Sequence, residues 1–188
     1  MKVIRTFVAV LIAQDLKQKM SEVQEQVKKL APDVKWVAPE IFHVTLKFLG
    51  NVREDELSAV CAAIEEAVKS CAPFELSISG LGAFPNPAKA RVVWVGIEKG
   101  RDELVGLASS IDKCLAKLGF EKEDKAFKAH ITIGRVKTSK FLNKLAEEIG
   151  NVDADNLGTQ QVSSVVVMQS ELLRGGPVYS PLSEIKLS

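Results

Sequence analysis

Hydrophobic and polar residues follow two different periods along this chain. In four segments the apolar side chains recur every three or four positions among Lys, Glu and Gln, which predicts amphipathic helices. These segments are residues 15–30, 53–68, 102–118 and 139–149. Pro32 and Pro73 follow the first two, and Gly119 stands where the third needs a C-cap.

The remaining apolar runs have the β-branched content or the period of two that is typical of strands. Gly50 is expected to end the strand at residues 42–49, and a proline-rich turn within residues 74–97 indicates a long hairpin. We expect loops at residues 121–128 and 151–158 and a turn at residues 172–179. The predicted strands, including the hairpin, cover residues 3–12, 34–37, 42–49, 74–97, 129–136, 161–169 and 184–187.

Both histidines of the chain begin the same short pattern, His-apolar-Thr-apolar. In the first copy His43 is followed by Thr45, and in the second His130 is followed by Thr132. Side chains at positions i and i+2 of a strand share a face, so each histidine lies on the same face as its threonine. A chain that uses its whole histidine supply in two matched patterns is predicted to build one site from two halves.

The order of the predicted elements also repeats: helix, loop, His-x-Thr strand, helix, strand. Sequence identity between the halves is low outside the histidine patterns, so the repeat is one of pattern. We therefore expect an α+β fold in which residues 1–188 form one bilobal domain of duplicated α-β units. Its sheets should be mostly antiparallel and should surround a central groove, with the histidine strands meeting across a pseudo-twofold axis.

Composition narrows the function. With 25 basic and 24 acidic residues the formal net charge is +1, so any affinity for nucleic acid must be local to a cleft. The three cysteines are an odd number without Cys-x-x-Cys spacing, which indicates free thiols and a reducing cytoplasm. The apolar start of the chain resembles a signal peptide only superficially, because Arg5 interrupts it. The sequence lacks an uninterrupted run of about eighteen apolar residues, so we expect no membrane span.

Three kinds of chemistry can use paired histidines. Metal binding is disfavoured because two histidines cannot complete a zinc site and no carboxylate or cysteine lies at ligand spacing. Nucleophilic catalysis is disfavoured because no Ser or Cys lies in a recognisable elbow. Acid/base catalysis on a phosphodiester explains more, since one imidazole can take a proton from the attacking oxygen while the other protonates the leaving oxygen. The hydroxyls of Thr45 and Thr132 would then hold the phosphoryl oxygens. Without a P-loop, an ATP-driven reaction is disfavoured.

The chain resembles a known family through both histidine patterns. They are similar to the H-x-[T/S]-x elements of the 2H phosphoesterases, and among these to the bacterial and archaeal RNA 2′,3′-cyclic phosphodiesterases, historically called 2′-5′ RNA ligases. Ala129 and Ala90 depart from the family, which usually has proline at the position of Ala129 and often has it at the position of Ala90. The resemblance covers nearly the whole chain, through residues 5–9, 43–50, 84–96, 127–136 and 176–179.

This resemblance implies hydrolysis of a 2′,3′-cyclic phosphate at an RNA 3′ end, such as that of a tRNA half, to a 2′-phosphate. A weaker, reversible and ATP-independent 2′-5′ joining activity is implied as well. The family's catalytic histidines correspond to His43 and His130, its threonines to Thr45 and Thr132, and its basic phosphate ligand to Arg135. We expect His130 to activate water and His43 to protonate the 3′-oxygen, although the pseudo-symmetry allows the reverse. The expected protein is a cytoplasmic monomer without cofactor, metal, membrane or protein partner.

Several further residues have open roles. Strict alternation places Arg135 opposite His130, so it reaches phosphate only if the strand bulges or ends near Gly134; otherwise it would form a surface ion pair. Lys47 alternates onto the His43 face, where it would bind RNA phosphate or lie at a solvated strand end. An aromatic side chain at the groove could stack a terminal base, although core or scaffold roles are favoured for the remaining candidates. These candidates are Arg5, Phe7, Phe48, Trp94 and Tyr179.

Three rival functions remain open on the same residues. The first is a 3′-exonuclease, and the second is a phosphodiesterase for small nucleotides such as ADP-ribose 1″,2″-cyclic phosphate. The third is a non-catalytic module that binds RNA ends or nucleotides. The paired His and Thr residues argue against the third, because binding alone does not need two titratable groups.

Overall fold

A computed structural model describes residues 2–29, 34–138 and 140–188. The helices are α1 (Gln14–Lys28), α2 (Leu57–Val68), α3 (Arg101–Ala116) and α4 (Leu142–Asn151), with short 3-10 turns η1 (Pro39–Ile41), η2 (Glu54–Glu56) and η3 (Pro87–Lys89). The strands are β1 (Val3–Leu11), β2 (Val34–Trp36), β3 (His43–Arg53), β4 (Phe74–Phe84), β5 (Val92–Ile97), β6 (His130–Val136), β7 (Gly158–Val162), β8 (Ser164–Leu173) and β9 (Gly176–Lys186).

The strands form an antiparallel sheet with a pseudo-symmetric order. The order is β7-β4-β5-β6-β3-β1-β8-β9, and β2 pairs with β6 beside this path. The histidine strands β6 and β3 are central neighbours that pair at Ile131 and Val44. Outward from them, β5-β4-β7 on one side matches β1-β8-β9 on the other. The predicted α+β fold of duplicated units is confirmed, and hydrogen bonds between β3 and β6 join the strands of its two halves.

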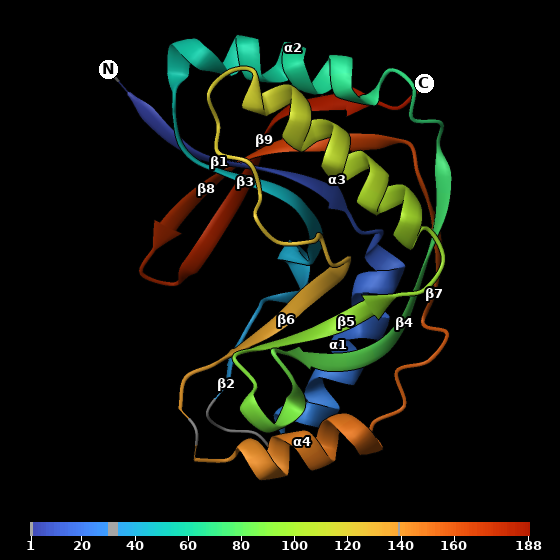
Figure 1. Cartoon of the computed structure of the whole chain (residues 1–188). Coiled ribbons are helices and arrows are strands. Elements are labelled where there is room, and N and C mark those ends of the chain that lie inside the picture. The colour runs from blue at the N-terminus through green and yellow to red at the C-terminus, as the bar shows by residue number, and fades with distance from the viewer. Residues whose placement is uncertain (1, 30–33, 139) are drawn as a thin grey trace.

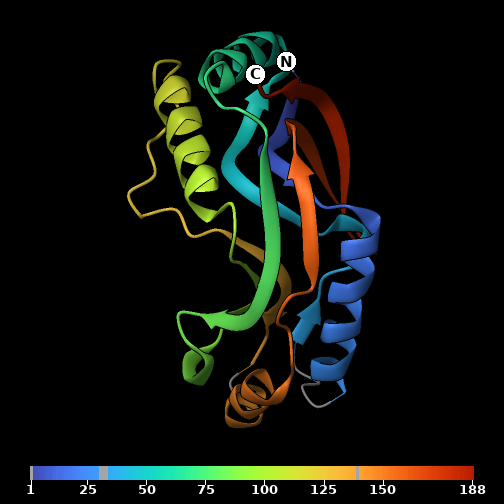
Figure 2. The ribbon, with the colours of Figure 1, turned by 90° about the vertical axis from the view of Figure 1, so that its right-hand side faces the viewer.

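The helices cover the two halves of the sheet in an exchanged arrangement (Figures 1 and 2). α2 and α3 pack together over the half that contains β3 and β9, whereas α1 and α4 pack on the half that contains β2, β4 and η3. α1 directly follows β1, and α3 directly follows β5. Each of these two helices therefore crosses from its own strand to the other half of the sheet, so the two repeats are interlocked.

The predicted apolar stripes of the helices form much of the core. Leu16, Met20 and Val27 of α1 and Leu104 and Ile111 of α3 are each at most 1% exposed. Burying a side chain of this size contributes roughly 1.5–3 kcal/mol, so these stripes hold the helices against the sheet. No helix within the described residues is long and apolar enough to cross a membrane.

Gly50 does not end its strand, contrary to the prediction. β3 continues through it to Arg53, and Gly50 has a φ of +70°. The pairing of β1 with β3 shifts beside it, because Thr6 pairs with Gly50 whereas Phe7 pairs with Phe48. Glycine adopts a left-handed φ without strain, so at this position it allows a β-bulge and the strand continues.

The C-terminal strands also differ from the prediction. The run at residues 161–169 is divided between β7 and β8, and most of residues 172–179 are strand, with a tight turn at residues 174–175. Pro177 fits in β9 because β9 lies at an edge of the sheet, where proline is tolerated. The fourth helix begins at Leu142. Three residues used to place helix ends lie outside the described residues: Leu30, Pro32 and Ser139.

Candidate active site

His43 begins β3 with its ring held at both nitrogens. Its Nδ1 lies 2.7 Å from the carbonyl oxygen of Ile41, so Nδ1 must carry the proton and donate it. In the neutral ring Nε2 then accepts a hydrogen bond, and the hydroxyl of Thr45 lies 2.9 Å away to donate it. The backbone thus fixes the tautomer that leaves Nε2 available for proton transfer.

His130 at the start of β6 is held at Nδ1 in the same way. Its Nδ1 donates to the carbonyl oxygen of Lys128 at 2.6 Å, again two residues earlier in the chain. An aromatic ring meets each imidazole edge to face: Tyr179 against His43 with centroids 5.4 Å apart, and Phe84 against His130 at 4.9 Å. The two histidines therefore occupy matching environments in the two halves.

The register between β3 and β6 brings the four predicted polar residues together. Because Val44 is paired with Ile131 in an antiparallel sense, the flanking residues face across the junction, His43 toward Thr132 and Thr45 toward His130. All four share the sheet face opposite the core side chains of Val44 and Ile131. We call this the site face. The expected meeting of the two histidine strands is confirmed.

Each histidine strand has a bulge immediately after its threonine. In β3 the pairing with β1 skips Leu46, and in β6 the pairing with β5 skips Ile133. The extra residue shifts the alternation by one position. Arg135 therefore pairs with Val92 on the site face, as a bulge near Gly134 was predicted to allow. Its positive charge contributes to the pKa shifts of both histidines, which indicates that it lies near them.

The same kind of bulge overturns the expectation for Lys47. Lys47 pairs with Val8, whose side chain is in the core, and is only 3% exposed. Its Nζ donates to Asp112 Oδ1 at 2.6 Å and to the carbonyl oxygen of Glu121 at 2.7 Å. Lys47 is therefore neither a phosphate ligand on the site face nor a solvated strand end. Phe48 takes the position on the site face instead.

Each bulge is held by the helix that crosses from the other repeat. Gln24 of α1 is 2% exposed, and its side-chain amide donates to the carbonyl oxygens of Ile133 and Val37 at 2.8 and 2.7 Å. On the other side, Asp112 of α3 accepts from Lys47, the residue next to the β3 bulge. Sequence inspection missed Gln24 and Asp112. The available signal for Gln24 was a polar residue between the apolar positions Val23 and Val27 of a helix.

Aromatic rings line the first histidine. The Phe7 ring lies 5.0 Å from the His43 ring and 4.9 Å from the Tyr179 ring, and Phe7 is buried as expected. Phe48 is 60% exposed, so the core role expected for it is wrong. Its ring centroid lies 6.1 Å from that of Phe7. An exposed ring beside the site face can offer a flat apolar surface to a ligand. Arg5 is also exposed.

The second histidine has a matching aromatic wall. Trp94 packs against Phe84 with ring centroids 5.2 Å apart, and Lys128 Nζ lies 5.4 Å from the Phe84 ring centre. Trp94 pairs with Thr132, and its indole Nε1 is buried without a hydrogen-bond partner among the described residues. Trp94 therefore supports this wall as a scaffold residue, in agreement with the prediction.

Burial lowers the pKa of both imidazoles below the usual value of 6.5. The carbonyls of Ile41 and Lys128 partly oppose this by favouring the protonated rings, whereas the charge of Arg135 lowers both pKa values further. Lys17 and His130 add to the lowering of the pKa of His43. Without a bound anion, both rings are therefore biased toward the neutral form. A negatively charged phosphate between them would act in the opposite direction and favour protonation.

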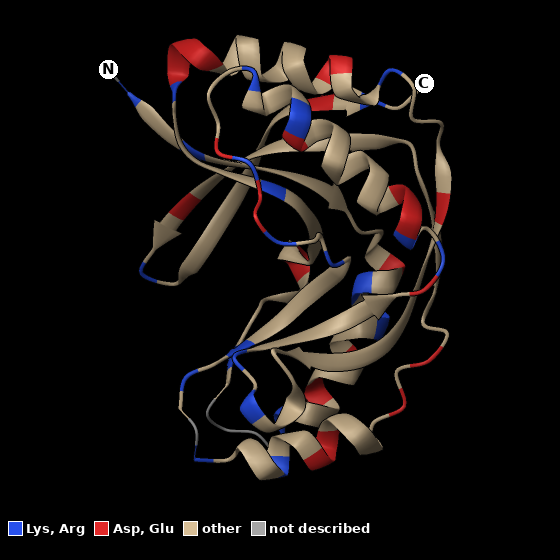
Figure 3. Ribbon diagram, in the orientation of Figure 1, with Lys and Arg blue, Asp and Glu red and all other residues tan. Residues whose placement is uncertain are grey.

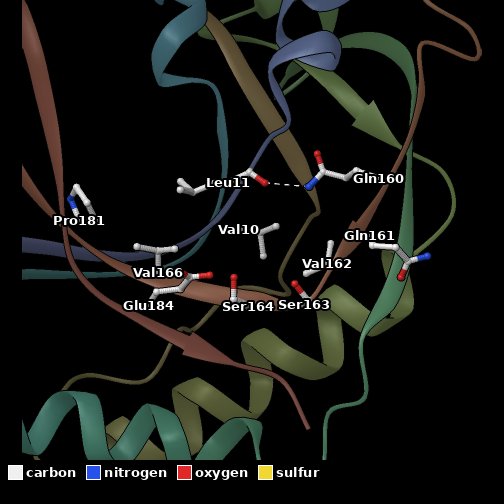
Figure 4. A pocket seen from close by; sticks show the side chains of 10 residues that line it. All are labelled: Val10, Leu11, Gln160, Gln161, Val162, Ser163, Ser164, Val166, Pro181 and Glu184. Carbon is white, nitrogen blue, oxygen red and sulfur yellow. Dashed lines mark hydrogen bonds between the residues drawn. The ribbon is translucent and has the colours of Figure 1, made fainter.

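Among the described residues, neither a group of metal ligands nor the pocket in Figure 4 coincides with the candidate site. Within residues 2–29, 34–138 and 140–188, no group of three or more His, Cys, Asp or Glu is placed to hold a metal ion. A pocket of about 330 Å³ lies beside the ends of β1, β7 and β8, where the side chain of Gln160 donates to the carbonyl oxygen of Leu11 (Figure 4). None of the five predicted site residues lines that pocket.

Comparison with known proteins agrees with the duplicated architecture. A family model described as LigT like Phosphoesterase matches residues 10–94 and again residues 95–179. The RNA 2′,3′-cyclic phosphodiesterase of Methanothermobacter thermautotrophicus is 38% identical over 184 residues, which cover 98% of this chain and 99% of the relative.

Two solved structures illustrate the shared fold. The TT0787 protein of Thermus thermophilus superposes with a TM-score of 0.78 at 28% identity and covers 97% of each chain. Escherichia coli LigT, solved in complex with 3′-AMP, has a TM-score of 0.80 at 22% identity, over 100% of this chain and 99% of LigT, and supports the fold. With its two family matches, its near full-length relative and its paired histidine strands, this chain belongs to the LigT-like family of 2H phosphoesterases.

Proposed function

We propose that this protein is an RNA 2′,3′-cyclic phosphodiesterase that hydrolyses a cyclic phosphate at an RNA 3′ end to a 2′-phosphate. The observation that carries the proposal is the register of β3 against β6, which sets His43 toward Thr132 and Thr45 toward His130 on one face. The name of the relative from M. thermautotrophicus supports the same activity.

The geometry supports a mechanism in which the two imidazoles act in turn. Nε2 of His130 takes a proton from water, whose oxygen attacks phosphorus, and Nε2 of His43 gives a proton to the departing 3′-oxygen. Each step uses Nε2, because Nδ1 of each ring is hydrogen-bonded to a backbone carbonyl. General acid and base groups of this kind each contribute on the order of 10²–10⁴ in rate. The similar surroundings of the two rings also allow the reverse assignment of the two roles. In the joining reaction a 5′-hydroxyl of a second RNA would replace water as the attacking group, and the 3′-oxygen would again leave.

The threonines and Arg135 would stabilise the phosphoryl oxygens. In the neutral state the hydroxyl of Thr45 donates to His43 Nε2. When His43 is protonated, Nε2 becomes a donor, so the Thr45 hydroxyl is released to donate to a phosphoryl oxygen. Thr132 supplies the second hydroxyl, and the guanidinium of Arg135 supplies charge.

Substrate binding would also set the protonation state that the reaction needs. Burial keeps the pKa of both rings low in the free protein. A phosphate anion between the rings raises the pKa of each, and the first ring to be protonated then lowers the pKa of the other. This arrangement favours one charged and one neutral imidazole, which is the pair that acid/base catalysis requires.

The proposed working form is a monomer in a reducing cytoplasm. All five proposed site residues come from one chain, so a second copy is not needed to complete the site. Cys61, Cys71 and Cys114 are free thiols, which suits a reducing compartment. RNA fragments with cyclic ends, such as tRNA halves, have the required chemistry.

The test is to incubate purified, chelator-treated protein with an oligoribonucleotide that ends in a 2′,3′-cyclic phosphate. The expected product keeps its full length and carries a 2′-phosphate. Mass spectrometry detects the addition of one water, and resistance to a phosphatase specific for 3′-phosphates assigns the phosphate to the 2′ position. Loss of terminal nucleotides would instead indicate a 3′-exonuclease. Binding without turnover would indicate a binding module, and turnover of ADP-ribose 1″,2″-cyclic phosphate alone would indicate a small-nucleotide enzyme.

A further inference from the structure

Two basic side chains lie directly opposite each other near the candidate active site. Lys35 of β2 pairs with Arg135 of β6, and both are exposed. Figure 3 shows Lys and Arg residues grouped around this end of β6. Among the described residues, neither side chain takes part in an ion pair.

The orientation of this pair follows from the packing on the other side of the sheet. A Cβ on Gly134 would lie 2.6 Å from Val34 Cγ1 and 2.9 Å from a ring carbon of Trp36, so those two side chains occupy the core side. Lys35, between them in β2, therefore points to the opposite side, which is the site face that carries Arg135.

Like charges placed directly across a sheet destabilise it unless something offsets the repulsion. No carboxylate pairs with either side chain among the described residues, so none of these supplies such an offset. An anionic group between Lys35 and Arg135 would supply it. The pair therefore has the character of an anion-binding position rather than of a stabilising surface contact.

The position of Lys35 and Arg135 relative to the histidines indicates which anion they would bind. Along β6, His130 and Thr132 are followed by Arg135 on the same face, and Lys35 lies one strand further out. Neighbouring strands are about 4.8 Å apart, a distance that a lysine side chain easily extends beyond. If Arg135 holds the reacting phosphate, its cross-strand neighbour Lys35 is close enough to reach an adjacent phosphate of an RNA chain.

We propose that Lys35 binds the internucleotide phosphate adjacent to the reactive 3′ end, so that the protein selects oligonucleotides over cyclic mononucleotides. This inference rests on the proposed function for the identity of the reactive end. The preferred substrate is then an RNA strand with at least one further phosphate on the 5′ side of the terminal nucleoside.

The experiment compares wild type, Lys35→Ala, Lys35→Arg and a control, Lys113→Ala, which removes an exposed lysine of α3 without an ion pair among the described residues. Substrates are cytidine 2′,3′-cyclic phosphate and a ten-nucleotide RNA with the same cyclic end. For Lys35→Ala we expect KM for the oligonucleotide to rise about fivefold at unchanged kcat, with the mononucleotide unaffected. Lys35→Arg should restore KM, and the salt dependence of oligonucleotide binding should fall by about one charge in Lys35→Ala.

A parallel measurement separates this inference from the proposed function. Fluorescence anisotropy follows binding of the ten-nucleotide RNA with a 3′-phosphate in place of the cyclic end. If binding of the 3′-phosphate RNA depends on Lys35 but the wild type does not hydrolyse the RNA with the cyclic end, only the proposed function is rejected. Hydrolysis with equal effects of Lys35→Ala on both substrates, or with no effect on either, would reject the role of Lys35 alone. If the wild type does not hydrolyse the cyclic end and its binding of RNA does not depend on Lys35, both the proposed function and the role of Lys35 are rejected.

Discussion

The ion pair between Lys47 and Asp112 gives the sharpest test of the structure. The Lys47 side chain is 3% exposed and also donates to the carbonyl oxygen of Glu121, while Asp112 accepts the backbone N–H of Glu123 at 3.2 Å. The cluster ties β3 and α3 to the loop that leads to His130. Lys47→Met keeps an unbranched side chain of similar length but removes the charge and both hydrogen bonds.

The expected cost follows from what the substitution leaves behind. Removing one partner of a buried ion pair typically costs about 3–5 kcal/mol, because the other charge remains desolvated. The side chain of Asp112 is 19% exposed, so water relieves part of this, and we expect a loss of about 2–4 kcal/mol in the free energy of unfolding. Asp112→Asn in the Lys47→Met background removes the unpaired charge and should recover about 1–2 kcal/mol.

The pH dependence has a definite sign. Burial alone would raise the pKa of the Asp112 carboxyl, but the hydrogen bonds from Lys47 and from the Glu123 backbone outweigh it and hold this pKa below the usual 3.8. A lowered folded-state pKa stabilises the fold above the usual value, and this stabilisation is lost as the pH falls through the folded-state pKa. Without Lys47, burial favours the protonated carboxyl of Asp112, so the difference between wild type and Lys47→Met should be largest near neutral pH and should shrink as the pH falls toward and below the usual pKa of 3.8.

Urea denaturation monitored by Trp fluorescence and circular dichroism measures these differences. The four proteins of the double-mutant cycle are wild type, Lys47→Met, Asp112→Asn and the double variant. Additive effects of the two substitutions, or a Lys47→Met protein as stable as wild type, would show that Lys47 is not paired in the interior. The bulge in β3 would then be misplaced as well.

Four further predictions concern the site and its support. His43→Ala and His130→Ala should each lower kcat for a cyclic-phosphate RNA about 100-fold or more, with an unchanged circular dichroism spectrum; near wild-type turnover in either variant would exclude the two-histidine mechanism. Because the pKa of each imidazole is lowered by burial, kcat/KM should peak below pH 6.5 and kcat at higher pH, and a common optimum above about pH 7 would contradict this. Gln24→Leu should cost about 1–3 kcal/mol of stability by leaving carbonyls of Ile133 and Val37 short of a donor, whereas Gln26→Ala, an exposed control on α1, should cost little. Prolonged dialysis against a chelator should change turnover by less than about twofold, and restoration of lost activity by a divalent ion would contradict the metal-free assignment.

Sequence patterns grouped the four polar residues of the candidate site because each His-x-Thr pair depends on local periodicity. A period of two places His43 with Thr45, and His130 with Thr132, without any knowledge of tertiary structure. The bulge near Gly134 was predicted only because Arg135 otherwise faced the wrong side. The equivalent bulge in β3 was missed, and with it both Lys47 and Phe48 were assigned to the wrong environment.

Other features depend on contacts that a single sequence does not reveal. The bonds of Gln24 to β6 and of Asp112 to Lys47 join residues 109 and 65 positions apart. The aromatic wall around His43 likewise depends on the path of β9, which brings Tyr179 to Phe7. Strands were predicted at residues 161–169 and 184–187, but residues 172–179 were assigned to a turn, and the division into β7, β8 and β9 depends on pairing at the edge of the sheet.

The crossing of α1 and α3 has a consequence for the origin of the fold. In a chain containing only the first repeat, α1 would lack α4 and the β6 carbonyl that Gln24 binds. β4 would lack β5, and β1 would lack β8. Two copies of such a half-length ancestor could satisfy each other only by exchanging these elements, as in a domain-swapped dimer. We infer that the present chain is such a dimer fused end to end, whose symmetric centre became the candidate site. Residues 1–90 expressed alone should be unfolded or dimeric, and a folded monomer in size-exclusion chromatography with light scattering would refute this history.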